Sequence, residues 1–125
     1  MRGVLFVVFF MMVSRVGYSM PNENVFNALI ESYPNITDTK LFNCTTCHTR
    51  NKWLRNAYGQ DLQDYLRSLY SDEINAEEYT QAMIVMAMGE INEIDSDGDG
   101  YTNIEEFNFG TYPGNKDDYP RVFKD

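Results

Sequence analysis

Both cysteines and the only histidine of this 125-residue chain fall within five consecutive residues, Cys44-Thr45-Thr46-Cys47-His48. A disulfide between cysteines this close would close so short a loop that it would constrain the unfolded chain little. The pattern C-x-x-C-H is instead the attachment signature of a c-type haem. Each thiol adds to one vinyl group, and the histidine takes the proximal position on the iron. We therefore expect Cys44, Cys47 and His48 to hold one covalent haem c.

Three other uses of these residues stay open. A thioredoxin-like redox pair would place C-x-x-C near a βαβ unit, and no strand pattern is visible. A structural zinc site has four ligands, whereas Cys44, Cys47 and His48 supply three. The third alternative is an incidental disulfide. The haem interpretation accounts for all three residues at once, and we carry it forward.

Apolar residues recur with helical rather than strand spacing, which predicts an all-α fold. We expect helices at about 21–33, 59–70 and 76–94, with a short fourth helix reaching 107–109. Pro34 should end the first, because the residue before a proline avoids the helical region. Glu77 and Glu78 should lie in the first turn of the third, where they suit the positive end of the helix dipole.

The second axial ligand of the iron cannot be a histidine of this chain, because His48 is the only one. A methionine thioether is the natural candidate and raises the reduction potential. Met83, Met86 and Met88 lie 35, 38 and 40 residues after His48, on different faces of the predicted third helix, so at most one should reach the iron. Met83, on the most apolar arc, is preferred. Ordinary core packing is the alternative for each, and an iron without a methionine would be open to a small ligand.

Residues 95–106 fit the EF-hand loop pattern D-x-[DN]-x-[DN]-G-x5-E at every defined position. Clustered carboxylates repel one another without a cation, so a bound Ca²⁺ is favoured over a solvated acidic turn. Only one such loop is present, and Thr102 replaces the usual aliphatic at position 8, so a structural role is expected rather than a switch. The predicted calcium ligands are the side chains of Asp95, Asp97, Asp99 and Glu106, the carbonyl of Tyr101, and Asn103 through a water.

The first 19 residues have the layout of a secretory signal peptide. Arg2 precedes ten apolar residues at 4–13, and Gly17 and Ser19 stand at the −3 and −1 positions of a cleavage site. Ten apolar residues are too few to span a bilayer as a helix, although an uncleaved anchor is the alternative and no firm membrane prediction follows. We expect a periplasmic or secreted protein with a haem-binding domain at 20–94, a calcium loop and turn at 95–118, and a tail at 119–125.

Acidic residues outnumber basic ones by 19 to 10, which gives a net charge of −9. Nucleic acid is therefore excluded as a partner, because phosphate binding needs clustered Lys and Arg. The acidity suits a bound cation or a redox partner protein with a basic docking surface. An electron carrier needs no substrate pocket, so we do not expect an enzyme.

Taken together, the two motifs resemble known families. Cys44 to His48, followed by Asn56-Ala57-Tyr58-Gly59, resembles small bacterial monohaem c-type cytochromes, although the Gly-Pro pair and Met-Pro ligand loop of many class I members are missing. The stretch 95–118, with Gly110-Thr111-Tyr112-Pro113 and Asp117-Asp118, is similar to thrombospondin type 3 calcium repeats. The resemblance implies a small helical cytochrome carrying single electrons, stabilised by calcium. The alternatives are a calcium-stabilised adhesion module without haem and a haem sensor with an open axial site.

Overall fold

The computed structural model describes residues 23–51, 53–71, 73–75 and 78–122, and the predicted signal peptide lies outside them. Every regular element within these ranges is helical, which confirms the all-α fold class. No helix among them is long and apolar enough to span a membrane. In chain order the elements are α1 (Glu23–Ser32), the 3-10 turns η1 (Ile36–Asp38) and η2 (Cys44–Thr46), α2 (Ala57–Leu69), α3 (Gln81–Glu90) and α4 (Asn103–Phe109).

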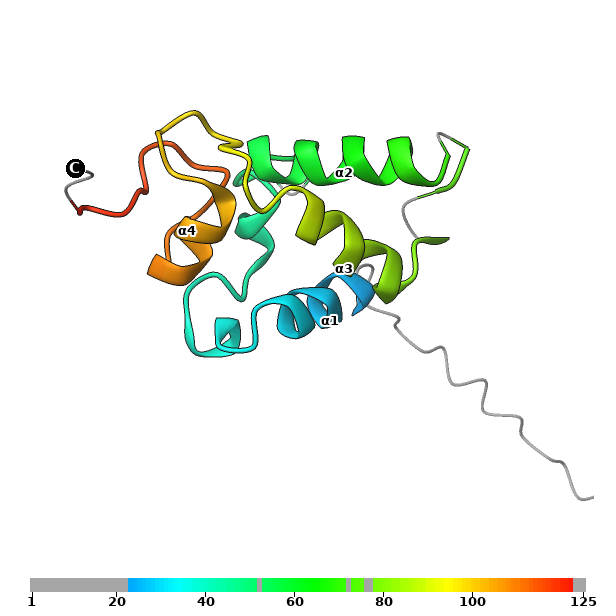
Figure 1. Ribbon diagram of the computed structural model, residues 1–125, viewed down its shortest axis with the longest axis horizontal. Helices are drawn as coiled ribbons and strands as arrows, with labels where there is room; N and C mark the ends of the chain where they lie inside the picture. The colour runs from blue at the N-terminus through cyan, green and yellow to red at the C-terminus, as the bar shows by residue number, and fades with distance from the viewer. Residues whose placement is uncertain (1–22, 52, 72, 76–77, 123–125) are drawn as a thin grey trace, which may run out of the picture.

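Helix α3 packs against both α1 and α2, as the ribbon shows (Figure 1). The shared core is formed by buried apolar side chains from all three helices, including Leu29, Leu62, Leu66 and Ile84. Cys47 packs against this core from the loop that precedes α2. The loop that carries Cys47 therefore faces the core formed by the three helices.

Helix α3 is shorter than the predicted 76–94, and the prediction that Glu78 occupies its first turn is wrong; Glu77 lies outside the described residues. The Thr80 hydroxyl accepts a hydrogen bond from the Met83 backbone N–H and caps the helix there. A capping oxygen satisfies one of the free N–H groups of the first turn, so the helix begins after it. The Asn103 side-chain amide donates to the Ile91 carbonyl at 2.9 Å. The chain leaves the helix at this point and enters the acidic loop.

Helix α4 begins with a reciprocal capping box between Thr102 and Glu105 and ends at Gly110, whose φ of 78° is the left-handed region that favours glycine. The Phe107 ring stacks on Tyr33 with a centroid separation of 3.9 Å, and it meets the Tyr58 ring edge-on at 5.4 Å. These contacts anchor α4, and with it the acidic loop, to the same core as α1 and α2.

Candidate functional site

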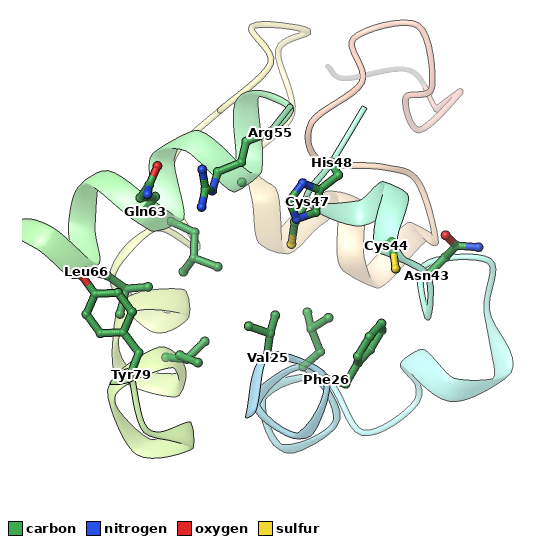
Figure 2. A pocket seen from close by; sticks show the side chains of 14 residues that line it. Val25, Phe26, Asn43, Cys44, Cys47, His48, Arg55, Gln63, Leu66 and Tyr79 are labelled. Atoms are coloured by element: carbon green, nitrogen blue, oxygen red, sulfur yellow. The ribbon is translucent and has the colours of Figure 1, made fainter. Parts of the chain in front are cut away.

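A cleft runs between the Cys44–His48 loop and α2 on one side and α1 and α3 on the other (Figure 2). Both cysteines and His48 line this cleft, and Figure 2 shows both sulfur atoms directed into it. The two thiols are free rather than joined in a disulfide. The apolar lining opposite and beside them comes from three helices: Val25, Phe26 and Leu29 of α1, Leu62 and Leu66 of α2, and Ile84 of α3.

Asn56 fixes the conformation of the cysteine loop. Its side-chain amide donates to the carbonyls of Thr45 and Thr46, both at 3.0 Å, and its backbone N–H donates to the Cys47 carbonyl at 2.9 Å. Its side-chain oxygen accepts from the Gly59 N–H at 2.9 Å and caps α2. One residue thus holds the loop in place and starts the helix behind it.

Gly59 is required by a close approach. A Cβ built at this position would lie 2.0 Å from the Cys47 carbonyl oxygen, far inside van der Waals contact. Sequence reasoning noted the Asn56 to Gly59 stretch only as part of a resemblance. The usable signal was an Asn three residues before a Gly at a helix start, which is the spacing of an N-cap bond.

Burial governs the protonation of the site. It raises the pKa of Cys47 to about 12, with the neighbouring Cys44 adding to the effect. Cys47 is therefore a neutral thiol at physiological pH, unlike the low-pKa thiolates of redox-active pairs. Burial, and then the positive charge of Arg55, lowers the pKa of His48. The imidazole is therefore neutral and able to offer a lone pair to a metal.

Two polar atoms of the cleft lack a hydrogen-bond partner among the described residues, the Nδ1 of His48 and the hydroxyl of Tyr79. Buried polar atoms normally have a partner, so each such atom calls for an explanation. For the His48 imidazole, which lines the cleft beside two thiols, a ligand bound in that cleft would explain the missing partner directly.

Arg55 was not singled out in the sequence, yet it lines the same cleft. An isolated antiparallel bridge pairs His48 with Arg55, and this short hairpin brings the guanidinium beside the imidazole. Figure 2 shows the guanidinium directed into the cleft on the α2 side, whereas Cys44 lies toward the other end. No carboxylate within the described ranges forms a salt bridge with it. The cleft therefore offers a free positive charge at one end, the Cys44 thiol toward the other and the Cys47 thiol between them.

The three candidate methionines are not among the described residues that line the cleft. Met88 is fully buried and its sulfur accepts a hydrogen bond from the Ser32 hydroxyl at 3.8 Å. Met86 is 57% exposed and its sulfur lies 3.6 Å from the Tyr70 hydroxyl. Met83 is partly buried against the core. The structure thus brings Cys44, Cys47 and His48 together but no methionine to them.

The acidic loop forms a second site. Carboxylate oxygens of Asp95, Asp97 and Asp99 lie within 4.8 Å of one another. The loop is turned by Gly98 and Gly100, whose φ angles are 75° and 93°. The Asp95 carboxylate accepts from the N–H groups of both glycines at 2.8 Å. The backbone therefore folds around the first aspartate, as the predicted EF-hand pattern requires.

Glu106 and Asn103 are brought to the same loop by the first turn of α4. Both side chains are fully buried, and the Glu106 Oε2 and Asn103 Oδ1 atoms have no hydrogen-bond partner within the part of the chain that the structure describes. The Oδ2 atoms of Asp97 and Asp99 are buried and have no hydrogen-bond partner in the same way. Four oxygen atoms are thus withheld from water with nothing to bind, a donor set that a hard cation prefers.

The charges of this loop are uncompensated. Burial, together with the nearby Asp97 and Asp99, raises the pKa of Glu106 to about 9. Burial and Asp99 raise the pKa of Asp97 to about 7. A divalent cation among these carboxylates would remove the repulsion between them. Tyr101 is buried, and its hydroxyl donates to the Val122 carbonyl at 2.7 Å; the ligand role of its own carbonyl stays a prediction.

No protein-family model, no curated protein and no solved structure matches this chain. Its function is therefore inferred from the chemistry of the two sites.

Proposed function

We propose that the protein is an exported c-type cytochrome that carries one haem and passes single electrons. The observation that supports this most is the convergence of both thiols and a neutral imidazole, with an unpartnered ring nitrogen, on one apolar cleft. When bound there, the haem iron would supply reversible one-electron redox chemistry.

The thiols of Cys44 and Cys47 would attach the cofactor. Each S–H would add across one vinyl double bond, so that the sulfur bonds to one carbon and the proton goes to the other. The addition needs no oxidant, and the neutral state of Cys47 keeps that proton in place at rest. His48, neutral because partial burial and the charge of Arg55 lower its pKa, would donate a nitrogen lone pair to the iron. The three residues would thus play the roles that the motif predicts.

Arg55 would orient the cofactor. The two propionate groups of a haem lie on the edge opposite its vinyl groups, and carboxylates pair favourably with a guanidinium. Figure 2 places Arg55 and Gln63 toward the α2 end of the cleft and Cys44 toward the other. The free guanidinium would therefore meet the propionates when the thiols meet the vinyl groups. The apolar lining from α1 and α3 would exclude water from the rest of the ring.

We propose Ca²⁺ as the second cofactor, bound by the loop 95–106. The fully buried Glu106 with an unpartnered oxygen supports this more than the aspartate cluster itself, because it is withheld from water and directed into that cluster. Loops of this kind with oxygen ligands bind Ca²⁺ in extracellular modules. An exported location would keep such a site loaded, so the ion would act as a permanent brace for α4.

The test is expression with haem-attachment machinery in an export host, followed by a pyridine haemochrome spectrum and the mass of the mature chain. We expect one covalent haem. Cys44→Ser and Cys47→Ser should each shift the α-band toward that of a haem with one free vinyl group. Thr45→Ala, which keeps both thiols and His48, is the matched control and should leave the spectrum unchanged. A colourless chain whose mass is lower by two hydrogens would overturn the proposal and favour a calcium-braced adhesion module.

A further inference from the structure

We infer that none of Met83, Met86 and Met88 ligates a haem iron held in this cleft, which would leave one axial position free for a small uncharged ligand. This inference rests on the proposed function, and it concerns the side of the cofactor opposite His48. It would make the protein a ligand-binding haem protein as well as an electron carrier.

The orientation of α3 carries the argument. Ile84 lines the cleft, and successive residues of a helix are rotated by about 100°. Met83 is therefore turned about 100° away from the cleft-facing direction of Ile84, and Met86 about 160°. The exposure of Met86 agrees with this rotation. In agreement with this rotation, neither Met83 nor Met86 lines the cleft that Ile84 lines.

Met88 lies on nearly the same face of α3 as Ile84, but at a different position along the helix axis. It lies four residues after Ile84 and so about 6 Å further along the helix. Its side chain is completely buried, and its sulfur is engaged by the Ser32 hydroxyl at the end of α1. Moving this thioether into the cleft would leave a cavity in the core and break that contact, a change that costs several kcal/mol in typical cores, about 2–5 for loss of a methionine side chain.

Among the residues that the structure describes, the wall of the cleft opposite the thiols offers no other strong ligand. It consists of Val25, Phe26, Leu29 and Ile84, which carry no donor atom. A tyrosinate can ligate haem iron, but Figure 2 places the Tyr79 hydroxyl beside Leu66, at the end of the cleft away from Cys44. A ligand position opposite His48 would therefore face the hydrocarbon side chains of the described wall.

An apolar wall favours uncharged ligands over charged ones. A charged ligand would lose its hydration without gaining a partner there, and that loss is expensive. A diatomic molecule such as carbon monoxide loses almost nothing. It would bind by donating the carbon lone pair to ferrous iron, with no bond broken, no proton released and no electron transferred.

The experiment uses the full protein after its haem content has been established by the pyridine haemochrome spectrum. Carbon monoxide is added to the dithionite-reduced protein, and resonance Raman spectra report the spin state before and after. We expect a five-coordinate high-spin ferrous haem and an immediate Soret shift with carbon monoxide. A six-coordinate low-spin spectrum in both oxidation states, unchanged by carbon monoxide, would overturn the inference and leave the haem proposal intact.

Variants locate the open position. Met83→Leu, Met86→Leu and Met88→Leu should keep the spectrum and the carbon monoxide affinity of the parent, with the exposed Met86 as the control for the buried Met88. Ile84→Ala, which removes part of the apolar wall and so enlarges the cleft, should speed carbon monoxide association. Conversion of a low-spin to a high-spin spectrum by any one methionine substitution would identify that residue as the ligand and refute the inference. The wild-type measurement stands even if Met88→Leu fails to fold.

Discussion

The contact between Gly59 and Cys47 gives a prediction whose sign is opposite to the usual rule. In most helices a glycine-to-alanine substitution stabilises, because alanine restricts the unfolded chain, by at most about 1 kcal/mol. At Gly59 the added methyl would lie 2.0 Å from the Cys47 carbonyl oxygen, which is backbone and cannot swing aside. We therefore expect Gly59→Ala to destabilise the protein.

The magnitude follows from the contacts that must move. Overpacking of this kind costs about 2 kcal/mol. If the loop retreats, the hydrogen bond from the Asn56 N–H to the Cys47 carbonyl is lost, which costs about 1 kcal/mol more. After the helix-propensity gain of about 1 kcal/mol, the net loss is about 2 kcal/mol. For a domain of this size, such a loss lowers Tm by about 10 °C.

Gly89 provides the matched control. It lies in α3, is exposed, and a Cβ built there meets nothing within 4 Å. Gly89→Ala should therefore raise the stability by about 0.5 kcal/mol. Urea and thermal unfolding of both variants, followed by circular dichroism, measures the two signs. A Gly59→Ala protein as stable as the parent would refute the close approach and the conformation of the cysteine loop that depends on it.

Three further predictions concern charge and metal. Excess Ca²⁺ should stabilise the folded chain, by about 2.7 kcal/mol at one hundred times Kd, and Glu106→Gln but not the exposed Glu90→Gln should lose the effect in a thermal shift assay. Without Ca²⁺, the folded-state pKa values of about 9 for Glu106 and about 7 for Asp97 exceed their ordinary values, so the folded state binds more protons than the unfolded state. The free energy of unfolding should therefore fall as the pH rises from about 4 to 9. A stability that instead rises over this range in the presence of a chelator would contradict the burial of these carboxylates. Arg55→Leu should lower the reduction potential of the haem protein, because a positive charge that disfavours the oxidised state is removed, whereas the exposed Arg67→Leu on α2 should leave a potentiometric titration unchanged.

The sequence located the residues of the two candidate sites better than the residues that surround them. Cys44 to His48 is a contiguous motif, so its residues had to lie together, and the loop 95–106 is contiguous in the same way. The all-α class followed from apolar spacing, because each helix buries one face. The start of α3 was misplaced because two acidic residues, Glu77 and Glu78, suggested a first turn. The helix begins instead after the Thr80 hydroxyl cap, because one side-chain hydrogen bond outweighs the weak preference of acidic residues for a first turn.

The walls of the cleft could not be predicted in this way. Arg55, Leu29 and Ile84 belong to three segments whose juxtaposition depends on how α1, α2 and α3 pack. The methionines show the same limit, since their spacing from His48 made them candidate iron ligands but helix rotation decides which side chain faces the cleft. Packing between distant segments therefore determines which residues surround a motif, whereas the motif itself consists of residues that are adjacent in the sequence.

The two sites are joined through neighbouring residues of α4. Glu106 turns into the acidic loop, and the next residue, Phe107, stacks on Tyr33 and meets Tyr58 in the core. Tyr58 in turn precedes Gly59, the residue pressed against the Cys47 carbonyl. A cation that draws in the Glu106 carboxylate therefore also holds the Phe107 ring against the helix that supports the cysteine loop. Because a seven-residue helix has little stability of its own, the proposed Ca²⁺ would help α4 to keep this position, and it would support the cleft although none of its predicted ligands lines that cleft.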